Sequence, residues 1–535
     1  MSTVHGWGSA LRLLWRRNRL FWVLWVVGLA LLMPLTATQY DRIVPSGTDA
    51  TAMLESFANN PSMTALLGPA WDLTTKGGFV FWRVGGFVSM FAGMMAAFGI
   101  IRSTRAEEED GRLELLRAGT LGRHAPLLAA IALWAGASLA AGALSGALAA
   151  AVGLPVPGAV AAALAVATPG LAFTGLGAVA AQLFESARSA RYWTVGAGWG
   201  GMFLLRMIVD GGGTDGPYAW ARWALPIEWG LLLRPWVAER WWVFALPVAL
   251  LAALTLLALR LESARDHGAG LRHTRLGRAG APASLSGPWG LAWRLQRGSI
   301  LGWTVALLVT AVGTGSIMSQ MDQALADNPE VGQLLQRMGG TENLQVAFYL
   351  AMLGILGTVA GVMGVTFLGR LRGEENAGHT EPMLATATSR WSYAGSHLVW
   401  ALAVPAVVFV AVGALMPLTQ AQAAQDYAPM GDYARAAAGL LPGVVLVVGL
   451  AMALIGWAPR LAWLVWVVVG WTMFATWFAV LFDVPAWLTD VNPFGYLAHL
   501  PRDEMDWRPF AIELALGLFL VVLGLVGYRR RNIPA

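Results

Sequence analysis

The sequence predicts an all-α polytopic membrane protein with about twelve transmembrane helices, arranged as a tandem duplication of a six-span unit. Of the 535 residues, 57% are hydrophobic and only 13% are charged, whereas soluble domains carry about 25% charged residues. A helix needs about 20 apolar residues to cross a hydrocarbon core of roughly 30 Å, and many stretches here reach that length. Landmark residues also recur in the same order in the two halves of the chain, which indicates the duplication.

Six apolar runs in each half predict the spans. The first run follows Arg12, Arg16, Arg17 and Arg19, and it is long enough to be an uncleaved span rather than a signal peptide. The runs do not alternate with a period of two residues, so helices are predicted. The predicted spans are about 20–38, 79–101, 124–152, 159–183, 192–209 and 241–260, then about 299–318, 346–369, 391–417, 436–457, 461–481 and 509–527.

Positive charge is distributed unevenly over the predicted loops. If the N-terminus is cytoplasmic, 25 of the 36 Lys and Arg residues fall on the cytoplasmic side, as the positive-inside rule requires. Both termini are therefore predicted to be cytoplasmic. The same rule accounts for the net charge of +5, so no nucleic-acid partner is expected.

A segment rich in Arg, Gly, Ala and Ser separates the halves. Residues 262–288 have no apolar face and are predicted to form a cytoplasmic linker between a first half, 1–261, and a second half, 289–535. At a shift of 267 residues, Arg105, Glu107, Glu108, Gly111, Glu114 and Arg123 correspond to Arg372, Glu374, Glu375, Gly378, Glu381 and Arg390. Arg16 and Trp25 correspond to Arg294 and Trp303 at a shift of 278. Each half has an even number of spans, so the repeats are predicted to be parallel.

The stretch "TRAEEEDGRLELLRAGTLGR" (104–123) lies between the second and third predicted spans. Thr104 and Glu107 have the spacing of a capping box, and the acids that follow suit the first turns of a helix. A single acidic run is usually a solvated loop. The duplication favours a second interpretation, in which two matching helices form a docking surface for a symmetric dimeric partner on the cytoplasmic side. The second copy differs at His379 and Pro382, where the first has Arg112 and Leu115.

These features resemble the membrane subunits of ATP-binding-cassette exporters. Within that group, the fused twelve-span form with an E-E-x-x-G-R-x-E loop resembles the actinobacterial polyketide-antibiotic (tetronasin-type) exporter permeases of the bacterial plasma membrane. The resemblance implies that residues 7–19 form an amphipathic elbow helix in the headgroup layer, although ordinary positive-inside flanking charge explains their arginines equally well. It also implies that the acidic segments are coupling helices that dock on ATPases. The implied docking residues are Glu107, Glu108, Gly111, Arg112 and Glu114 in the first half, and Glu374, Glu375, Gly378, His379 and Glu381 in the second.

The source of energy is expected to lie in other chains. A phosphate-binding loop needs a lysine after its glycines, and the only lysine, Lys76, stands in "LTTKGG" on the predicted outer side. We therefore expect no enzymatic activity, catalytic residue, metal site or cofactor in this chain. The expected partners are two ATPase subunits that bind ATP and Mg²⁺, most simply a homodimer.

Two other classes of function stay open. A secondary transporter would use acids inside the membrane, and the sequence predicts none well inside a span. A membrane enzyme that acts on lipid-linked sugars would use acids on an outer loop, for which residues 502–507 are the nearest candidate.

Methionine and aromatic residues on the second and fifth predicted spans are the candidates for a substrate path. Flexible methionines and flat rings suit a large, apolar small molecule. Core packing and contact with lipid are the alternative explanation for each of them. The candidates are Phe91, Met94, Met95, Phe98 and Trp199 in the first half, and Phe348, Met352 and Trp471 in the second.

Overall fold

The computed structural model describes residues 3–44, 54, 58, 61–117, 119, 121–266, 268–272, 280–327, 344–478, 492–495, 497, 500 and 504–532. The chain forms two compact units, Met1–Leu276 and Gly277–Ala535. The division falls within the segment predicted as a linker, of which residues 267 and 273–279 lie outside the described residues.

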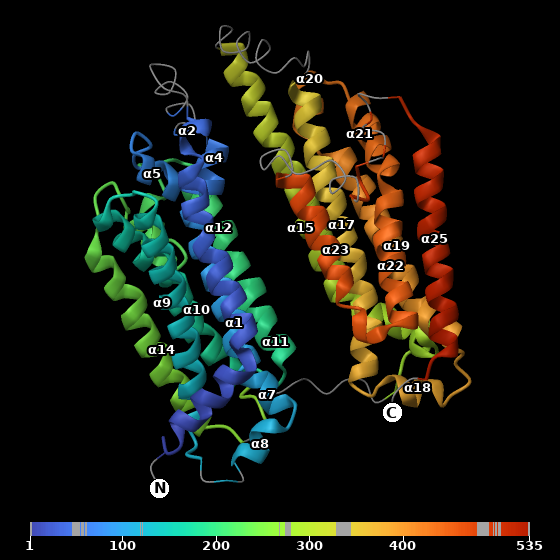
Figure 1. Cartoon of the computed structure of the whole chain (residues 1–535), viewed down its shortest axis with the longest axis horizontal. Coiled ribbons are helices and arrows are strands. Elements are labelled where there is room, and N and C mark those ends of the chain that lie inside the picture. Colours follow the sequence, from blue (N-terminus) through green and yellow to red (C-terminus); the bar gives the residue numbers. More distant parts are fainter. Residues whose placement is uncertain are drawn as a thin grey trace. The chain divides into compact units, whose positions relative to one another are not determined.

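The first unit is a bundle of helices (Figure 1). Its long helices are α1 (Trp7–Thr38), α6 (Gly86–Arg102), α9 (Ala125–Ala151), α10 (Val156–Leu183), α12 (Gly201–Asp210) and α14 (Ala245–Ser263). Its short helices are α2 (Tyr40–Ile43), α4 (Pro61–Leu67), α5 (Lys76–Val80), α7 (Arg105–Glu109), α8 (Arg112–Arg117), α11 (Ala187–Arg191) and α13 (Trp229–Leu232). Two π-helical stretches, Phe81–Gly85 and Tyr192–Gly200, join α5 to α6 and α11 to α12.

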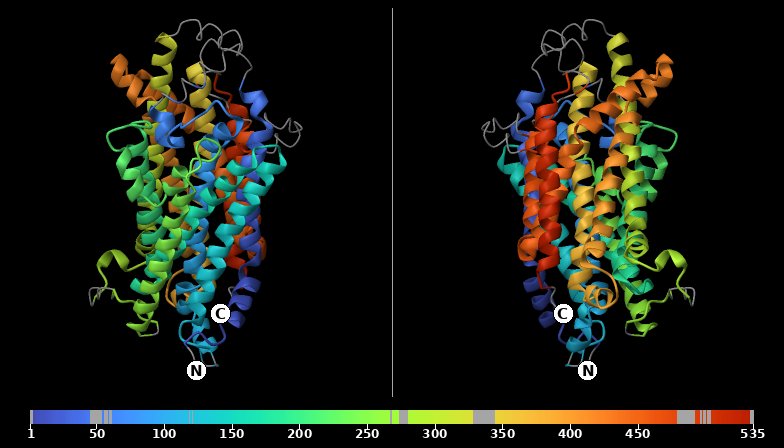
Figure 2. Two further views of the ribbon diagram at one scale, coloured as in Figure 1. Left: turned by 90° about the vertical axis from the view of Figure 1, so that its left-hand side faces the viewer. Right: turned by 90° about the vertical axis from the view of Figure 1, so that its right-hand side faces the viewer.

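The second unit is also helical, and Figure 2 shows the helices of both units from two further sides. Its helices are α15 (Pro288–Asp327), α17 (Leu344–Asn376), α18 (Thr380–Leu384), α19 (Arg390–Leu415), α20 (Leu418–Ala424), α21 (Ala428–Gly439), α22 (Leu441–Trp457), α23 (Leu464–Phe478) and α25 (Trp507–Arg530). The predicted all-α membrane fold is confirmed, because ten helical segments among the described residues are long and apolar enough to span a membrane.

The remaining two predicted spans are helical but fall short of that criterion. The fifth corresponds to residues 187–210, whose glycines and charged residues lower its hydropathy. The eleventh corresponds to α23, a shorter apolar helix that the structure describes as far as residue 478.

The N-terminal helix differs from the sequence prediction. Residues 7–19 are helical, but they continue without a break into the first span as the 32-residue helix α1. No proline precedes Pro34 in this helix, so nothing in the sequence separates an elbow from the span. At 1.5 Å per residue, α1 is about 48 Å long and extends beyond the roughly 30 Å hydrocarbon layer.

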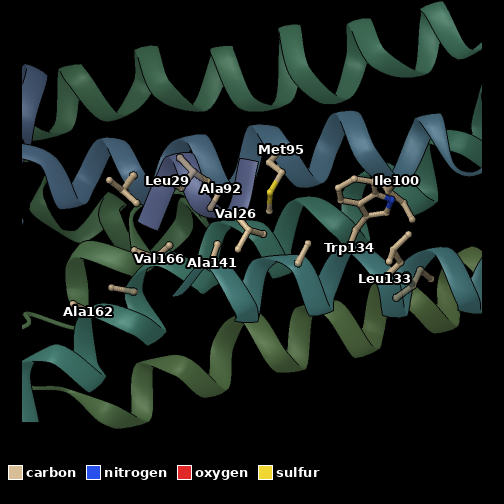
Figure 3. Packing of buried hydrophobic residues seen from close by; sticks show 14 of the residues in the cluster. Val26, Leu29, Ala92, Met95, Ile100, Leu133, Trp134, Ala141, Ala162 and Val166 are labelled. Atoms are coloured by element: carbon tan, nitrogen blue, oxygen red, sulfur yellow. The ribbon is translucent and has the colours of Figure 1, made fainter. Parts of the chain in front are cut away.

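Small residues allow close packing between the long helices. In the first unit, Trp134 of α9 is fully buried against Gly99 of α6 and Phe21 of α1, beside Ile100 (Figure 3), and its Nε1 donates to Ser103 Oγ over 2.9 Å. In the second unit, a Cβ added at Gly456 of α22 would overlap the carbonyl group of Gly524 in α25. Such contacts between glycines and backbone are typical of helices packed within membranes.

Gly456→Ala is therefore expected to destabilise the second unit. The methyl group meets a backbone atom that cannot rotate away, and such overpacking costs about 1–3 kcal/mol. Gly470→Ala in α23 is the matched control, since its Cβ would meet nothing within 4 Å. Thermal unfolding in detergent should show a lower midpoint for Gly456→Ala only. Equal midpoints for the two variants would contradict the close contact.

Candidate functional site

The first acidic segment is held by a buried carboxylate. Glu108 on α7 is bound bidentately by Arg265, with Nη1–Oε1 and Nη2–Oε2 distances of 2.6 and 2.7 Å. Arg105 Nη1 lies 3.0 Å from Glu108 Oε2, and the backbone N–H of Gly268 donates to Oε1 over 2.8 Å. The Glu108 side chain is only 3% exposed. We call Arg105, Glu108 and Arg265 the first clasp.

The first clasp joins three parts of the chain. Arg105 and Glu108 both lie on α7, and Arg265 follows the end of α14. Arg105 Nε and Nη2 also donate to the carbonyl oxygen of Glu185, between α10 and α11, over 2.9 and 2.6 Å. Arg265 Nε donates to Gln182 Oε1 over 2.9 Å. The acidic segment is thus fixed to the ends of the fourth and sixth spans of its own unit.

The second unit contains the same arrangement. Glu375, at the end of α17, lies 2.7 Å from Arg372 Nη1 and also pairs with Arg531, which follows α25. The Glu375 side chain is 1% exposed. We call Arg372, Glu375 and Arg531 the second clasp. α18 and the C-terminal end of α25 lie at the same end of this unit, as α7, α8 and the beginning of α1 do in theirs (Figure 1).

A further arginine supports each clasp through backbone contacts. Arg123 Nη2 donates to the carbonyl oxygens of Glu262 and Arg265, and Arg390 Nη1 donates to those of Arg529 and Arg531. Arg123 and Arg390 were paired by the sequence repeat, whereas the roles of Arg265 and Arg531 were not predicted. The sequence signal that could have predicted these roles is that Arg265 and Arg531 each stand just after the sixth span of their half, at a shift of 266 residues.

Glu107 and Glu374, which directly precede the clasp glutamates Glu108 and Glu375, also have equivalent partners. Glu107 pairs with Arg17 of α1 and lies 3.5 Å from Arg112 Nη1. Glu374 lies 2.9 Å from His379 Nδ1. His379 therefore occupies the position of Arg112 in contact as well as in sequence.

A glycine in the left-handed conformation turns the chain in both segments. Gly111 has φ +70° and Gly378 has φ +73°, and a Cβ at either would meet nothing within 4 Å. Glycine adopts this conformation without the steric cost that other residues pay. The turn at Gly111 separates α7 from α8, so the single helix predicted here is two short helices.

The predicted capping box is wrong. Thr104 Oγ1 donates back to the carbonyl oxygen of Ile100 over 2.6 Å, and its side chain caps no N–H of α7. The acidic side chain that does cap a helix is Glu109, which accepts from the backbone N–H of Ala187 at the start of α11 over 3.0 Å.

The ten predicted docking residues divide into two groups. Glu108, Glu374 and Glu375 are buried, and Glu107 is mostly covered, so these acids face their own unit. The exposed members are Arg112 and Glu114 of α8, then His379 and Glu381 at the start of α18. With the turn residues Gly111 and Gly378, these exposed side chains form what we call the outer face of each acidic segment.

Two of the predicted substrate-path residues meet in the first unit. Phe91 of α6 stacks on Trp199 at a centroid distance of 6.4 Å, and Trp199 stacks on Phe203 at 5.8 Å. Trp199 Nε1 donates to the carbonyl oxygen of Met90 over 2.7 Å. Met94 and Phe98 are half-buried, whereas Met95 is fully buried in the core (Figure 3).

The candidates in the second unit belong to separate small clusters. Phe348 lies beside Tyr349 at a centroid distance of 6.0 Å, and Trp471 lies beside Phe474 at 5.7 Å. Met352 is half-buried against the core of the second unit. The aromatic stack of the first unit therefore has no direct counterpart among these residues.

Charged side chains are buried beside that aromatic stack. On α12, Arg206 Nε lies 3.2 Å from Asp210 and 2.6 Å from Glu228, and Arg222 Nε lies 2.8 Å from Asp210. Arg206 Nη1 also lies 2.7 Å from Met90 Sδ. Burial raises the pKa of the Glu228 carboxyl, an effect that Arg206 opposes and Asp210 reinforces. We call Arg206, Asp210, Arg222 and Glu228 the buried charge cluster.

The expectation that no acid lies well inside a span is wrong for the second unit. Glu513 is the seventh residue of α25 and is half-buried. Of the outer-loop candidates at 502–507, residues 502 and 503 lie outside the described residues. Within the part of the chain that the structure describes, no group of three His, Cys, Asp or Glu residues is placed to hold a metal ion.

The fold and its duplicated clasps define a multi-pass α-helical membrane protein built from two related units. Residues 285–529 match the family model described as the C-terminal domain of the multidrug efflux system permease Rv1217c. The chain is also 36% identical over 529 residues to the multidrug efflux system permease protein Rv1217c of Mycobacterium tuberculosis (strain ATCC 25618 / H37Rv), covering 98% of this chain and 94% of that protein. The chain therefore belongs to the family of this multidrug efflux permease.

Proposed function

We propose that this chain is the permease of an ATP-driven exporter of hydrophobic small molecules, and that two ATPase subunits on separate chains supply the energy. The observation that carries the proposal is the paired acidic segment: each unit has one, with the same clasp, the same left-handed glycine and an exposed outer face. The similarity to a multidrug efflux permease along almost the whole chain supports export of drugs.

The outer faces are the proposed docking sites. Arg112 and Glu114 in the first unit, and His379 and Glu381 in the second, combine both charge signs on a short helix and a tight turn. Two similar surfaces on one chain suit two copies of one ATPase, so a homodimer that binds ATP and Mg²⁺ is the proposed partner. Docking places both acidic segments in the cytoplasm, with the permease in the bacterial plasma membrane.

The clasps give the docked segments a mechanical role. A displacement of α7 or of the end of α17 reaches the ends of other spans through Arg265 or Arg531, because these arginines join both elements. On the substrate side, the stack of Phe91, Trp199 and Phe203 offers flat apolar surfaces to a hydrophobic ligand. Polyketide antibiotics of the tetronasin type are the first substrates to test.

An ion-gradient-driven transporter is the second candidate, and two observations favour it. Glu513 lies within a membrane-spanning helix, and the buried charge cluster contains two acids, Asp210 at the end of the fifth span and Glu228 directly before α13. Ionisable groups inside membranes often bind protons or ions.

Transport into inverted vesicles separates the two candidates. The chain is reconstituted with a candidate ATP-binding-cassette ATPase, and uptake of a fluorescent hydrophobic drug is measured. ATP-driven export predicts uptake that requires ATP and persists when ionophores collapse the proton and sodium gradients. Uptake that follows an imposed gradient without ATP would contradict the proposal and support the second candidate.

A further inference from the structure

The first helix of each unit carries the same short pattern near its beginning. Residues 15–19 read "WRRNR" in α1, and residues 293–297 read "WRLQR" in α15. The shift of 278 residues is the one that relates Arg16 and Arg294, so the tryptophans and the second arginines correspond as well. Trp15, Arg16, Arg19, Trp293, Arg294 and Arg297 are all exposed.

A buried amide fixes the direction in which these arginines face. Asn18 in α1 is buried, and its Nδ2 donates to the carbonyl oxygen of Leu14 over 2.9 Å. Its counterpart Gln296 in α15 is also buried, and its Nε2 lies 3.0 Å from His397 Nδ1. At 100° per residue, Asn18 is about 160° from Arg16 around the helix. Burial of the amide therefore holds the arginine face outward in both units.

An exposed apolar stripe continues from the arginines along the same helix face. Residues at intervals of four after the second arginine remain on one side of the helix. These residues are Val23, Val27 and Leu31 in α1, and Leu301, Val305 and Val309 in α15, and all of them are exposed. Each helix thus presents a tryptophan, two guanidinium groups and an apolar stripe in that order along its length.

The four arginines are not neutralised within the described part of the chain. The structure places no carboxylate within ion-pair distance of Arg16, Arg19, Arg294 or Arg297 among the described residues, whereas the adjacent Arg17 pairs with Glu107. Two guanidinium groups one turn apart can bind one phosphate through several N–H donors. Tryptophan is favoured at the level of lipid headgroups.

We propose that each Trp-Arg-x-x-Arg pattern binds the headgroup phosphate of an anionic phospholipid, whose acyl chains lie along the apolar stripe. The lipid belongs to the leaflet that the arginines face, which the positive-inside rule assigns to the cytoplasm. The chain therefore has two equivalent lipid sites, one on the first helix of each unit. This inference is independent of how transport is energised.

Native mass spectrometry of the delipidated full chain tests the inference. The protein is titrated with phosphatidylglycerol, with phosphatidylcholine of the same acyl chains, or with inorganic phosphate alone. Two phosphatidylglycerol molecules should bind more tightly than phosphatidylcholine, and inorganic phosphate should not compete at millimolar concentration, because it lacks the contact with the apolar stripe. Arg16→Gln/Arg19→Gln should remove one of the two sites, and Arg294→Gln/Arg297→Gln the other. Each arginine near an anionic surface strengthens binding about fivefold, so each pair should weaken its site roughly 30-fold.

Arg529→Gln/Arg530→Gln is the matched control. Like the test variants, it removes two exposed arginines from the end of a helix, here α25. These two arginines are adjacent in sequence and leave the helix about 100° apart, so they do not form the proposed phosphate site. The control should retain both sites. Equal losses in the control and the test variants, or equal affinity for the two lipids, would overturn the proposal. If a glutamine variant does not fold, the corresponding Arg→Lys pair replaces it. That pair should bind several-fold more weakly than the native chain, because lysine lacks the planar fork, and unchanged affinity would also overturn the proposal.

Discussion

Replacing Glu108 with glutamine is expected to lower the stability of the first unit by about 3 kcal/mol, the lower end of the cost of breaking a buried ion pair. The change leaves Arg105 and Arg265 buried without the carboxylate that neutralises them. For a unit of this size, such a loss lowers the midpoint of thermal unfolding by about 6–12 °C. Differential scanning fluorimetry of the purified chain would measure the shift.

Glu114→Gln provides the matched control in the same segment, because Glu114 is exposed on α8. Exposed substitutions usually change stability by less than about 0.5 kcal/mol. Glu375→Gln should repeat the Glu108 result in the second unit, where Arg372 and Arg531 lose their shared partner. Small and equal shifts in all three variants would show that the clasps contribute no stability.

Replacing Arg206 with methionine is expected to be the other strongly destabilising change, at about 3–5 kcal/mol. Asp210 and Glu228 are fully buried, and Glu228 loses the cation that lies 2.6 Å away. Methionine has a similar length and an apolar side chain, so it leaves a buried acid unpaired without leaving a large cavity. The midpoint of thermal unfolding in detergent would again be the measurement.

The double variant Arg206→Met/Glu228→Leu distinguishes lost pairing from lost packing. A buried ion pair can often be replaced by apolar side chains at little cost, so the second substitution should recover most of the stability. If the two substitutions instead add their separate costs, packing of the Arg206 side chain determines the effect.

The sequence was sufficient to predict the features that depend on composition and on the repeat. Apolar length predicted the spans, and the constant shift of 267 residues paired Glu108 with Glu375 and Gly111 with Gly378. The two glycines have φ angles only 3° apart, +70° and +73°. A repeated sequence therefore corresponds to a repeated backbone turn.

The inward direction of Glu108 and Glu375 could not be predicted in the same way. Glu108 is buried because Arg265, 157 residues further along the chain, reaches it from beyond the sixth helix. Local patterns of charge favoured exposed acids and a capping box at Thr104. Long-range ion pairs hold Glu108 and Glu375 against their own units, so the proposed docking function is assigned to the outer face rather than to the whole acidic run.

Cross-linking from single cysteines would test the proposed docking most directly. The chain contains no cysteine, so Glu114→Cys, Glu381→Cys and Asp215→Cys each introduce one reactive thiol at an exposed position. The chain is co-purified with the proposed ATPase partner and treated with a short thiol-to-amine cross-linker. Docking at the acidic segments predicts permease–ATPase adducts from positions 114 and 381 and none from position 215 on the opposite side. Adducts from position 215 alone, or from none of the three, would contradict it.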